Sequence, residues 1–269
     1  MKASKPIPSP LQPVKPRRLS TTDATGPLLE EASQVAVEAP VTIEVHGAGA
    51  YTLLCSPTDV RALAVGFLLG EGMIERLDDI FLLEECQETP GLVRVRVKDI
   101  AGARERNLLI VSSCGLCGSE SVDEMLRRLP EVGESLRVPG RMLCHLSESL
   151  RRRQIVFSKS GCTHAAGVFT SDGEIISFAE DIGRHNALDK TIGKCLLARR
   201  RSAGRGVALT GRVSVEMVVK CARAGIELMS AVSAPTSLAL DAARRSKITL
   251  CGFVREGRAS VYSCPERVL

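Results

Sequence analysis

Two cysteines separated by two residues are the strongest chemical signal in this sequence. Cys114 and Cys117 stand in the stretch Ser-Ser-Cys-Gly-Leu-Cys-Gly, where a glycine follows each of them. Such a pair can belong to a zinc site, cycle between dithiol and disulfide, or carry a sulfur atom as a persulfide. The fourth interpretation is a turn with two inert thiols, and the two glycines make it the weakest.

The residues themselves leave two of these interpretations open. Zinc takes four ligands, and Cys144-His145 or Cys162 with His164 would have to complete the site, although no spacing demands it. A strand, the pair and then a helix is a thioredoxin-like layout, but the surrounding elements follow a different order. A thiolate on a mobile, glycine-rich loop suits a sulfur relay equally well.

Cys162 and His164 form a second candidate group of their own. At positions i and i+2 of a strand, the two side chains point to one face. They suit a zinc site or a nucleophile–base pair, although a Cys-x-His pattern is more often structural.

Three junctions between a strand and the following helix predict a site for an anion. They span 180–186, 210–214 and 233–237. If the strands are parallel, the three helix N-termini open at one edge of the sheet, where free N–H groups bind phosphate. Arg184 and Arg212 stand at two of the junctions and can clamp phosphate oxygens.

Gly211 and His185 belong to the same predicted anion site. A helix N-terminus favours the neutral form of His185, which makes this residue the better functional candidate of the two histidines in the region. The alternative is that Thr210, Ser214 and Thr236 are only helix caps.

The hydrophobic pattern predicts an α/β chain in two parts behind a tail. Residues 1–33 are rich in Pro, Ser, Thr and basic side chains, which predicts disorder. Residues 34–135 predict an α+β domain that ends in the Cys-x-x-Cys loop and a short helix. In 136–269 one helix over 142–157 precedes alternating strands and helices, which predicts a mixed sheet with helices on both faces.

The composition of the chain argues against nucleic acids and membranes as partners. The chain has 269 residues, a net charge of +5, only 3% aromatic residues and no Trp, which argues against a protein that stacks nucleic-acid bases. The N-terminus lacks the apolar segment of a secretory signal, and no apolar run is long enough to cross a bilayer. We therefore expect a cytoplasmic protein with reduced thiols that binds neither nucleic acid nor membrane.

Several stretches, in order from about residue 35 to the end, resemble the formate dehydrogenase accessory sulfurtransferase family, FdhD. They are GFLLGEGMI (66–74), SSCGLCG (112–118), GCTHAAGVF (161–169), EDIGRHNALDKTIG (180–193), LTGRVSVEMVVKCARAGI (209–226), SAPTSLALDAA (233–243) and GFVREGRASVY (252–262).

The resemblance implies a sulfur carrier. Such a protein takes persulfide sulfur from a cysteine desulfurase and passes it to the molybdenum cofactor, Mo-bis(molybdopterin guanine dinucleotide), that formate dehydrogenase requires. It places the persulfide on Cys114 and makes Cys117 the supporting thiol. The stretch that it implies as cofactor contact is Phe253, Val254, Arg255, Glu256, Gly257 and Arg258.

The resemblance also implies a cytidine-deaminase-like fold for the larger domain and a homodimer. Zinc deaminases carry His-x-Glu at one helix start and Pro-Cys-x-x-Cys at the next, whereas this chain reads Arg184-His185-Asn186 and Thr210-Gly-Arg-Val213. We therefore expect no zinc and no deaminase reaction, and we expect the vacated edge to hold the pyrophosphate of the guanine dinucleotide. The alternative function is a chaperone that binds the molybdenum cofactor for apo-formate dehydrogenase without a covalent step.

Overall fold

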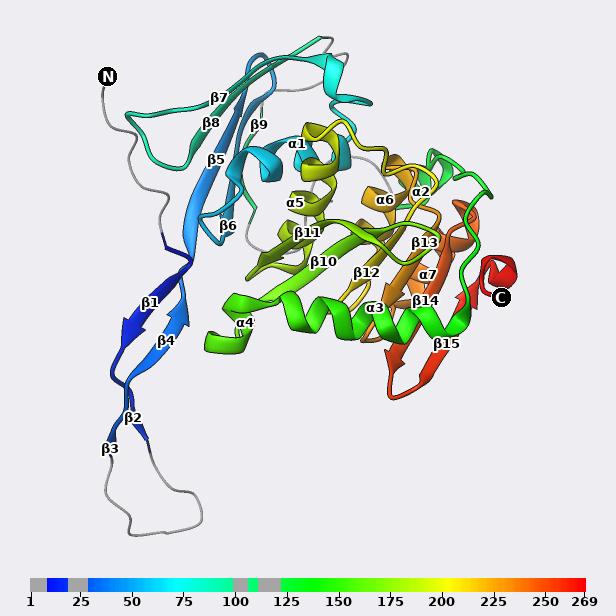
Figure 1. Cartoon of the computed structure of the whole chain (residues 1–269). Coiled ribbons are helices and arrows are strands. Elements are labelled where there is room, and N and C mark those ends of the chain that lie inside the picture. The colour runs from blue at the N-terminus through cyan, green and yellow to red at the C-terminus, as the bar shows by residue number, and fades with distance from the viewer. Residues whose placement is uncertain (1–8, 19–28, 99–105, 111–121) are drawn as a thin grey trace.

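The computed structural model of the chain describes residues 9–18, 29–98, 106–110 and 122–269 (Figure 1). Cys114 and Cys117 lie outside the described residues. The strands are β1 Leu11–Val14, β2 Arg17–Arg18, β3 Leu29–Glu30, β4 Ser33–Ala36, β5 Ala39–Val45, β6 Gly49–Cys55, β7 Ile80–Glu85, β8 Leu92–Val97, β9 Arg106–Ile110, β10 His164–Phe169, β11 Ile175–Asp181, β12 Gly206–Leu209, β13 Leu228–Ala231, β14 Thr249–Arg255 and β15 Arg258–Ser263. The helices are α1 Val60–Gly70, α2 Val122–Arg127, α3 Gly140–Arg153, α4 Ile155–Ser160, α5 Arg184–Leu197, α6 Val215–Arg223 and α7 Ser237–Arg245, with short 3₁₀ turns at Leu77–Asp79 and Pro265–Arg267.

A five-stranded sheet dominates the first half of the chain, in the strand order β7-β8-β5-β6-β9. β5 and β6 form an antiparallel hairpin, and its turn uses Gly47 at a φ of 79°, a backbone region that favours glycine. Val93, Val95 and Val97 of β8 are buried. The intervening arginines are exposed, which confirms the predicted alternation.

A six-stranded sheet forms the second half, in the order β11-β10-β12-β13-β14-β15. β12, β13 and β14 run parallel, and β11 points the same way because β10 is antiparallel to both β11 and β12. The helices α5, α6 and α7 therefore begin at one edge of the sheet, as the three junctions predict. The mixed sheet confirms the α/β class.

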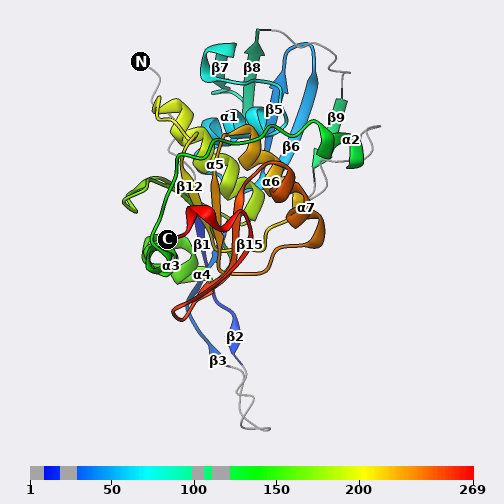
Figure 2. The same cartoon turned by 90° about the vertical axis from the view of Figure 1, so that its right-hand side faces the viewer.

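Helices cover both faces of the six-stranded sheet, as Figures 1 and 2 show from two directions. Alternate residues of β12 separate the two faces, because Val207 and Leu209 pack in the core with α5, α6 and α7, whereas Ala208 packs in the core with α3. This alternation is what a central strand with two covered faces requires. No helix in the described ranges is both long and apolar enough to cross a bilayer.

The two halves meet where α1 crosses α5. A Cβ atom added to Gly66 would lie 1.8 Å from the carbonyl oxygen of Asp189, and one added to Gly193 would lie 1.9 Å from that of Ala62. No side chain fits at either glycine, so the two helix backbones are in direct contact. Buried apolar residues of both halves form one continuous core around this crossing.

The predicted disorder over 1–33 is wrong for part of that segment. β1 pairs with β4 and β2 pairs with β3, and the resulting ribbon extends away from the body of the protein (Figure 1). The composition argument missed it because the partner strand β4 crosses the predicted boundary at residue 33. Inter-strand backbone hydrogen bonds, together with packing of β4 against α4, order a segment that has few apolar side chains.

The helix predicted over 142–157 is divided in two. Gln154, with φ −76° and ψ 81°, ends α3 and begins α4. This residue leaves the helical conformation and places its amide side chain in the interior, where it is 3% exposed.

Candidate functional site

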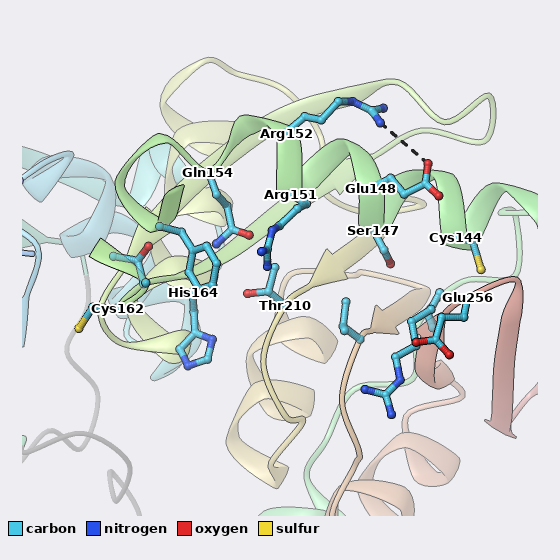
Figure 3. Close-up of a pocket in the computed structure, with 16 residues that line it drawn as sticks. Cys144, Ser147, Glu148, Arg151, Arg152, Gln154, Cys162, His164, Thr210 and Glu256 are labelled. Atoms are coloured by element: carbon cyan, nitrogen blue, oxygen red, sulfur yellow. Dashed lines mark ion pairs between the residues drawn. The ribbon is translucent and has the colours of Figure 1, made fainter. Parts of the chain in front are cut away.

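A pocket of about 660 Å³ opens on the α3 side of the six-stranded sheet, at the edge where β12, β13 and β14 end (Figure 3). Thr210, Val232 and Val254 line it from the ends of these three strands. His164 lines it from the start of the antiparallel strand β10. The pocket thus lies at the carboxyl edge of the parallel strands, where α/β sheets usually bind ligands.

Charged side chains surround this pocket. Arg151 and Arg152 come from the last turn of α3, and Arg255 comes from the end of β14. Arg152 pairs with Glu148 at 3.9 Å, and both side chains are largely exposed. The Arg151 guanidinium lies 4.5 Å from the centre of the Phe157 ring. The wall therefore combines cations with an aromatic face, which suits an anionic ligand that also carries a ring.

The predicted contact stretch 253–258 reaches the pocket through its middle. Val254, Arg255 and Glu256 are lining residues. Phe253 is 41% exposed, and Arg258 is exposed and pairs with Glu256 at 3.3 Å. Gly257 forms the turn between β14 and β15, at a φ of 72°.

Gln154 is a pocket residue that the sequence did not indicate. Its Nε2 is buried and has no hydrogen-bond partner among the described residues. A buried donor without a partner costs about 1–3 kcal/mol. A ligand acceptor in the pocket would remove that cost, so this amide is a second sign that the pocket receives a ligand.

The predicted anion site lies at the N-termini of α5 and α6. Arg184 is the first residue of α5, and Gly211 and Arg212 precede α6. The Arg184 side chain lies 3.2 Å from the place where a Cβ of Gly211 would stand, so a larger residue at 211 would displace it. The Nε atom of Arg184 is buried and has no partner among the described residues. Burial, and after it the charge of Arg212, lowers the pKa of Arg184.

His185 contacts a carboxylate that sequence reasoning missed. Its Nε2 lies 2.9 Å from Ser214 Oγ and 3.1 Å from Glu216 Oε2. Burial alone would raise the pKa of Glu216, but hydrogen bonds from His185 and Ser214 and the Arg184 charge hold this pKa below its ordinary value. The sequence shows only that Glu216 is an acidic residue in the first turn of α6, and nothing local to it indicates the contact with His185.

His164 joins the pocket to the anion site. It lines the pocket, and its Nδ1 lies 3.3 Å from the position of a Cβ on Gly211. Burial lowers the pKa of His164, and the charges of Arg184 and Arg212 lower it further. The imidazole is therefore neutral at neutral pH and can accept a proton.

The cysteines fall into distinct environments. Burial raises the pKa of Cys55 and of Cys251 to about 12, and it raises that of Cys221 as well, so these thiols are inert core residues. Cys162 is exposed and Cys144 is partly exposed, and both line the pocket. Within the described ranges, no three His, Cys, Asp or Glu side chains are grouped closely enough to hold a metal ion.

Comparison with known proteins gives a consistent result. The model of the FdhD/NarQ family matches residues 36–269. The sulfur carrier protein FdhD of Bordetella petrii is 40% identical over 245 residues, which cover 88% of this chain and 87% of the relative. That of Thermoplasma acidophilum is 34% identical over 250 residues, or 90% and 89% of the two chains. A crystal structure described as a formate dehydrogenase accessory protein from Desulfotalea psychrophila matches with a TM-score of 0.76 and 26% identity, over 97% of this chain and all of that one.

Proposed function

This chain belongs to the FdhD/NarQ family, and on that premise we propose that it is a sulfurtransferase of molybdenum cofactor maturation. It takes persulfide sulfur from a cysteine desulfurase and transfers it to Mo-bis(molybdopterin guanine dinucleotide), the cofactor that formate dehydrogenase requires. The observation that carries the proposal is the pocket at the carboxyl edge of the sheet. It joins three arginines and the Gln154 Nε2, which has no hydrogen-bond partner in the described part of the chain.

Cys114 is the proposed carrier. Its thiolate attacks the outer sulfur of the desulfurase persulfide, a new S–S bond forms, and the desulfurase thiolate leaves. Cys117, two residues away, supports the carried sulfur by exchange. Both residues lie outside the described residues, so this assignment rests on the motif and on the relatives' name.

The acceptor is proposed to bind between the pocket and the anion site. Its guanine dinucleotides carry pyrophosphates, which suit Arg184, Gly211, Arg212 and His185 at the two helix N-termini. Arg255 at the pocket wall suits a further phosphate. A volume of about 660 Å³ is in the range of pockets for ligands of this kind and accommodates part of the cofactor.

We also propose three further properties of this protein that concern its topology, its oligomeric state and its location. They are a cytidine-deaminase-like topology for the six-stranded sheet, a homodimer, and a cytoplasmic protein. Partnership with a formate dehydrogenase is supported by the description of the Desulfotalea psychrophila protein.

Intact-protein mass spectrometry after incubation with a cysteine desulfurase and cysteine tests the function. We expect an added sulfur atom on the wild type that digestion assigns to Cys114, its removal by a reductant, and its loss from that residue in Cys114→Ala. Cys264→Ala, which changes a partly exposed cysteine of unrelated location, is the matched control and keeps the adduct. If the Cys114→Ala protein still supports formate dehydrogenase maturation, the protein acts instead as a chaperone that binds the cofactor without a covalent step.

A further inference from the structure

We propose that Cys162 is a second sulfur-bearing thiol, which accepts sulfane sulfur from a persulfide and presents it at the pocket wall. The proposal rests on the proposed function, because the pocket is taken to hold the sulfur acceptor. It assigns a role to Cys162 and His164, which lie outside the Cys114–Cys117 motif of the proposed carrier.

Hydrogen bonds of Gly161, Cys162 and Thr163 hold the backbone on both sides of the Cys162 thiol. Gly161 ends α4 at a φ of 68°, and its N–H donates to the Phe157 carbonyl at 2.7 Å. The backbone N–H of Cys162 donates to Ser160 Oγ at 3.3 Å. On the other side, the Thr163 hydroxyl donates to Glu180 Oε1 at 2.6 Å.

Glu180 also fixes the beginning of α4. Its carboxylate accepts the N–H groups of Val156 and Phe157 at 3.0 and 2.6 Å. One carboxylate thus holds α4 at its N-terminus and the chain directly after Cys162, while the Cys162 thiol itself is exposed. An accessible thiol on a backbone held in this way suits a group that must meet a bound ligand repeatedly.

A buried nitrogen of Gln154 is the independent observation that points to a ligand in this pocket. Gln154 is 97% buried, since its exposed fraction is 3%, and its Nε2 has no partner among the described residues. Cys162 and Cys144 lie toward opposite ends of the pocket in Figure 3. His164 lies at the Cys162 end, whereas the Cys144 thiol faces the Arg258 carbonyl at 3.7 Å.

The chemistry balances without an added oxidant. The Cys162 thiolate attacks the outer sulfur of a persulfide R–S–SH; the new S–S bond forms as the old one breaks, and R–S⁻ leaves with the electron pair. The sulfane sulfur keeps its oxidation state, so the step is a transfer and not a redox reaction. The proton that Cys162 gives up passes to the leaving thiolate. Cys162 precedes β10, which begins at His164, so the two residues are not the predicted i, i+2 pair of one strand. The neutral His164 imidazole lines the same end of the pocket and is the proposed carrier of this proton.

Peptide mapping of the full chain tests the assignment. The protein is treated with glutathione persulfide, alkylated and cleaved with trypsin. Cys162 is the single cysteine of the tryptic peptide 160–184, whereas Cys114 and Cys117 share 107–127 and Cys264 is alone in 259–267. We expect an added sulfur atom on 160–184 that persists in Cys114→Ala and disappears in Cys162→Ala. We expect the occupancy of 160–184 to exceed that of 259–267 by about tenfold, because Cys162 lines the pocket and Cys264 does not.

Two outcomes would overturn the inference: no sulfur on 160–184, or equal occupancy on 160–184 and 259–267, which would indicate indiscriminate exposure. The map also separates this inference from the proposed function. Sulfur on 107–127 alone, from a cysteine desulfurase, supports the carrier role of Cys114 and rejects that of Cys162. Sulfur on 160–184 alone supports Cys162 and rejects loading through Cys114.

The same map tests His164 as the carrier of the proton. His164→Gln keeps the side-chain size and a hydrogen-bonding group but cannot take up a proton. We expect it to slow sulfur uptake on 160–184 by about tenfold, the lower end of general-base effects, and to remove the pH dependence of that uptake. Unchanged uptake with an unchanged pH profile would reject the proton-transfer role.

Discussion

The α1–α5 crossing and the pocket under α3 both bury polar side chains, but they treat them differently. At the crossing, Lys190 and Asp181 are fully buried, and their Nζ and Oδ2 atoms lie 2.5 Å apart. Within the described part of the chain, the pocket and the adjoining anion site instead leave nitrogens of Gln154 and Arg184 without partners. The first region pairs its buried charges with one another, since Asp189 there also bonds Lys220 through Oδ2 at 2.9 Å, although its Oδ1 has no hydrogen-bond partner among the described residues. The second region leaves donor nitrogens that a ligand could engage.

The largest expected effect comes from breaking the paired region. Lys190→Met leaves Asp181 as an uncompensated buried charge, which should lower the free energy of unfolding by about 3–5 kcal/mol. Urea denaturation measures it. The double variant Lys190→Met/Asp181→Asn should recover much of the loss, and if it does not, the two side chains are not a pair in the energetic sense.

The glycine contacts at the crossing come next. Gly193→Ala places a Cβ 1.9 Å from the Ala62 carbonyl oxygen, so the helices must separate, at a cost of about 1–3 kcal/mol. Gly140→Ala in α3 is the matched control, since its nearest neighbour would lie 3.6 Å away. Equal stability of the two variants in thermal denaturation would contradict the close contact.

At the pocket and the anion site, a substitution should weaken ligand binding and leave the stability of the fold unchanged. Arg212 is exposed beside the N-terminus of α6, and Arg212→Ala should weaken GDP binding about tenfold, the equivalent of one charge-assisted hydrogen bond. Calorimetric titration measures it, with Arg245→Ala, at the end of α7, as the control. A stability change as large as the binding change would remove the distinction between the two regions.

The smallest effect is a pH dependence. The pKa of His164 is lowered in the folded protein, by burial first and by Arg184 and Arg212 second, so the unfolded chain binds the proton more readily. Stability should therefore fall as pH falls through the ordinary histidine pKa of about 6.5 and below it. His164→Gln should reduce that fall, measured as the difference in urea midpoint between about pH 7 and about pH 5.5. An identical difference in the variant would assign the titration to other groups.

Local patterns carried much of the fold. The alternation around Val95 and the junctions at Arg184 and Arg212 depend on spacing within a few residues, and the sequence displays such spacing directly. Contacts between distant segments have no such signature. The Gly66–Gly193 crossing, the pairing of β1 with β4 and the contact of His185 with Glu216 were invisible for that reason.

The candidate site, like the fold, could be predicted only where its residues form a local sequence pattern. Arg255 and Glu256 were expected at a cofactor and line the pocket, while the roles of Cys114 and Cys117 stay predictions. Gln154 was missed because a single change of backbone direction inside a helical pattern turns an apparently solvent-facing amide inward. Only the three-dimensional position of α4 reveals it.

The contacts near the α1–α5 crossing also determine whether the two sheets unfold together. Ser56, at the end of β6, donates its backbone N–H to Asp181 at 3.0 Å, and its carbonyl accepts from Lys190 at 2.8 Å. The residue that follows the five-stranded sheet's β6 is thereby bonded to both members of the ion pair between Asp181 of β11 and Lys190 of α5. Heat should therefore melt the two sheets in one cooperative transition, with a single calorimetric peak. A fragment that begins after the Cys-x-x-Cys loop would expose this ion pair to water and should not hold its native structure alone.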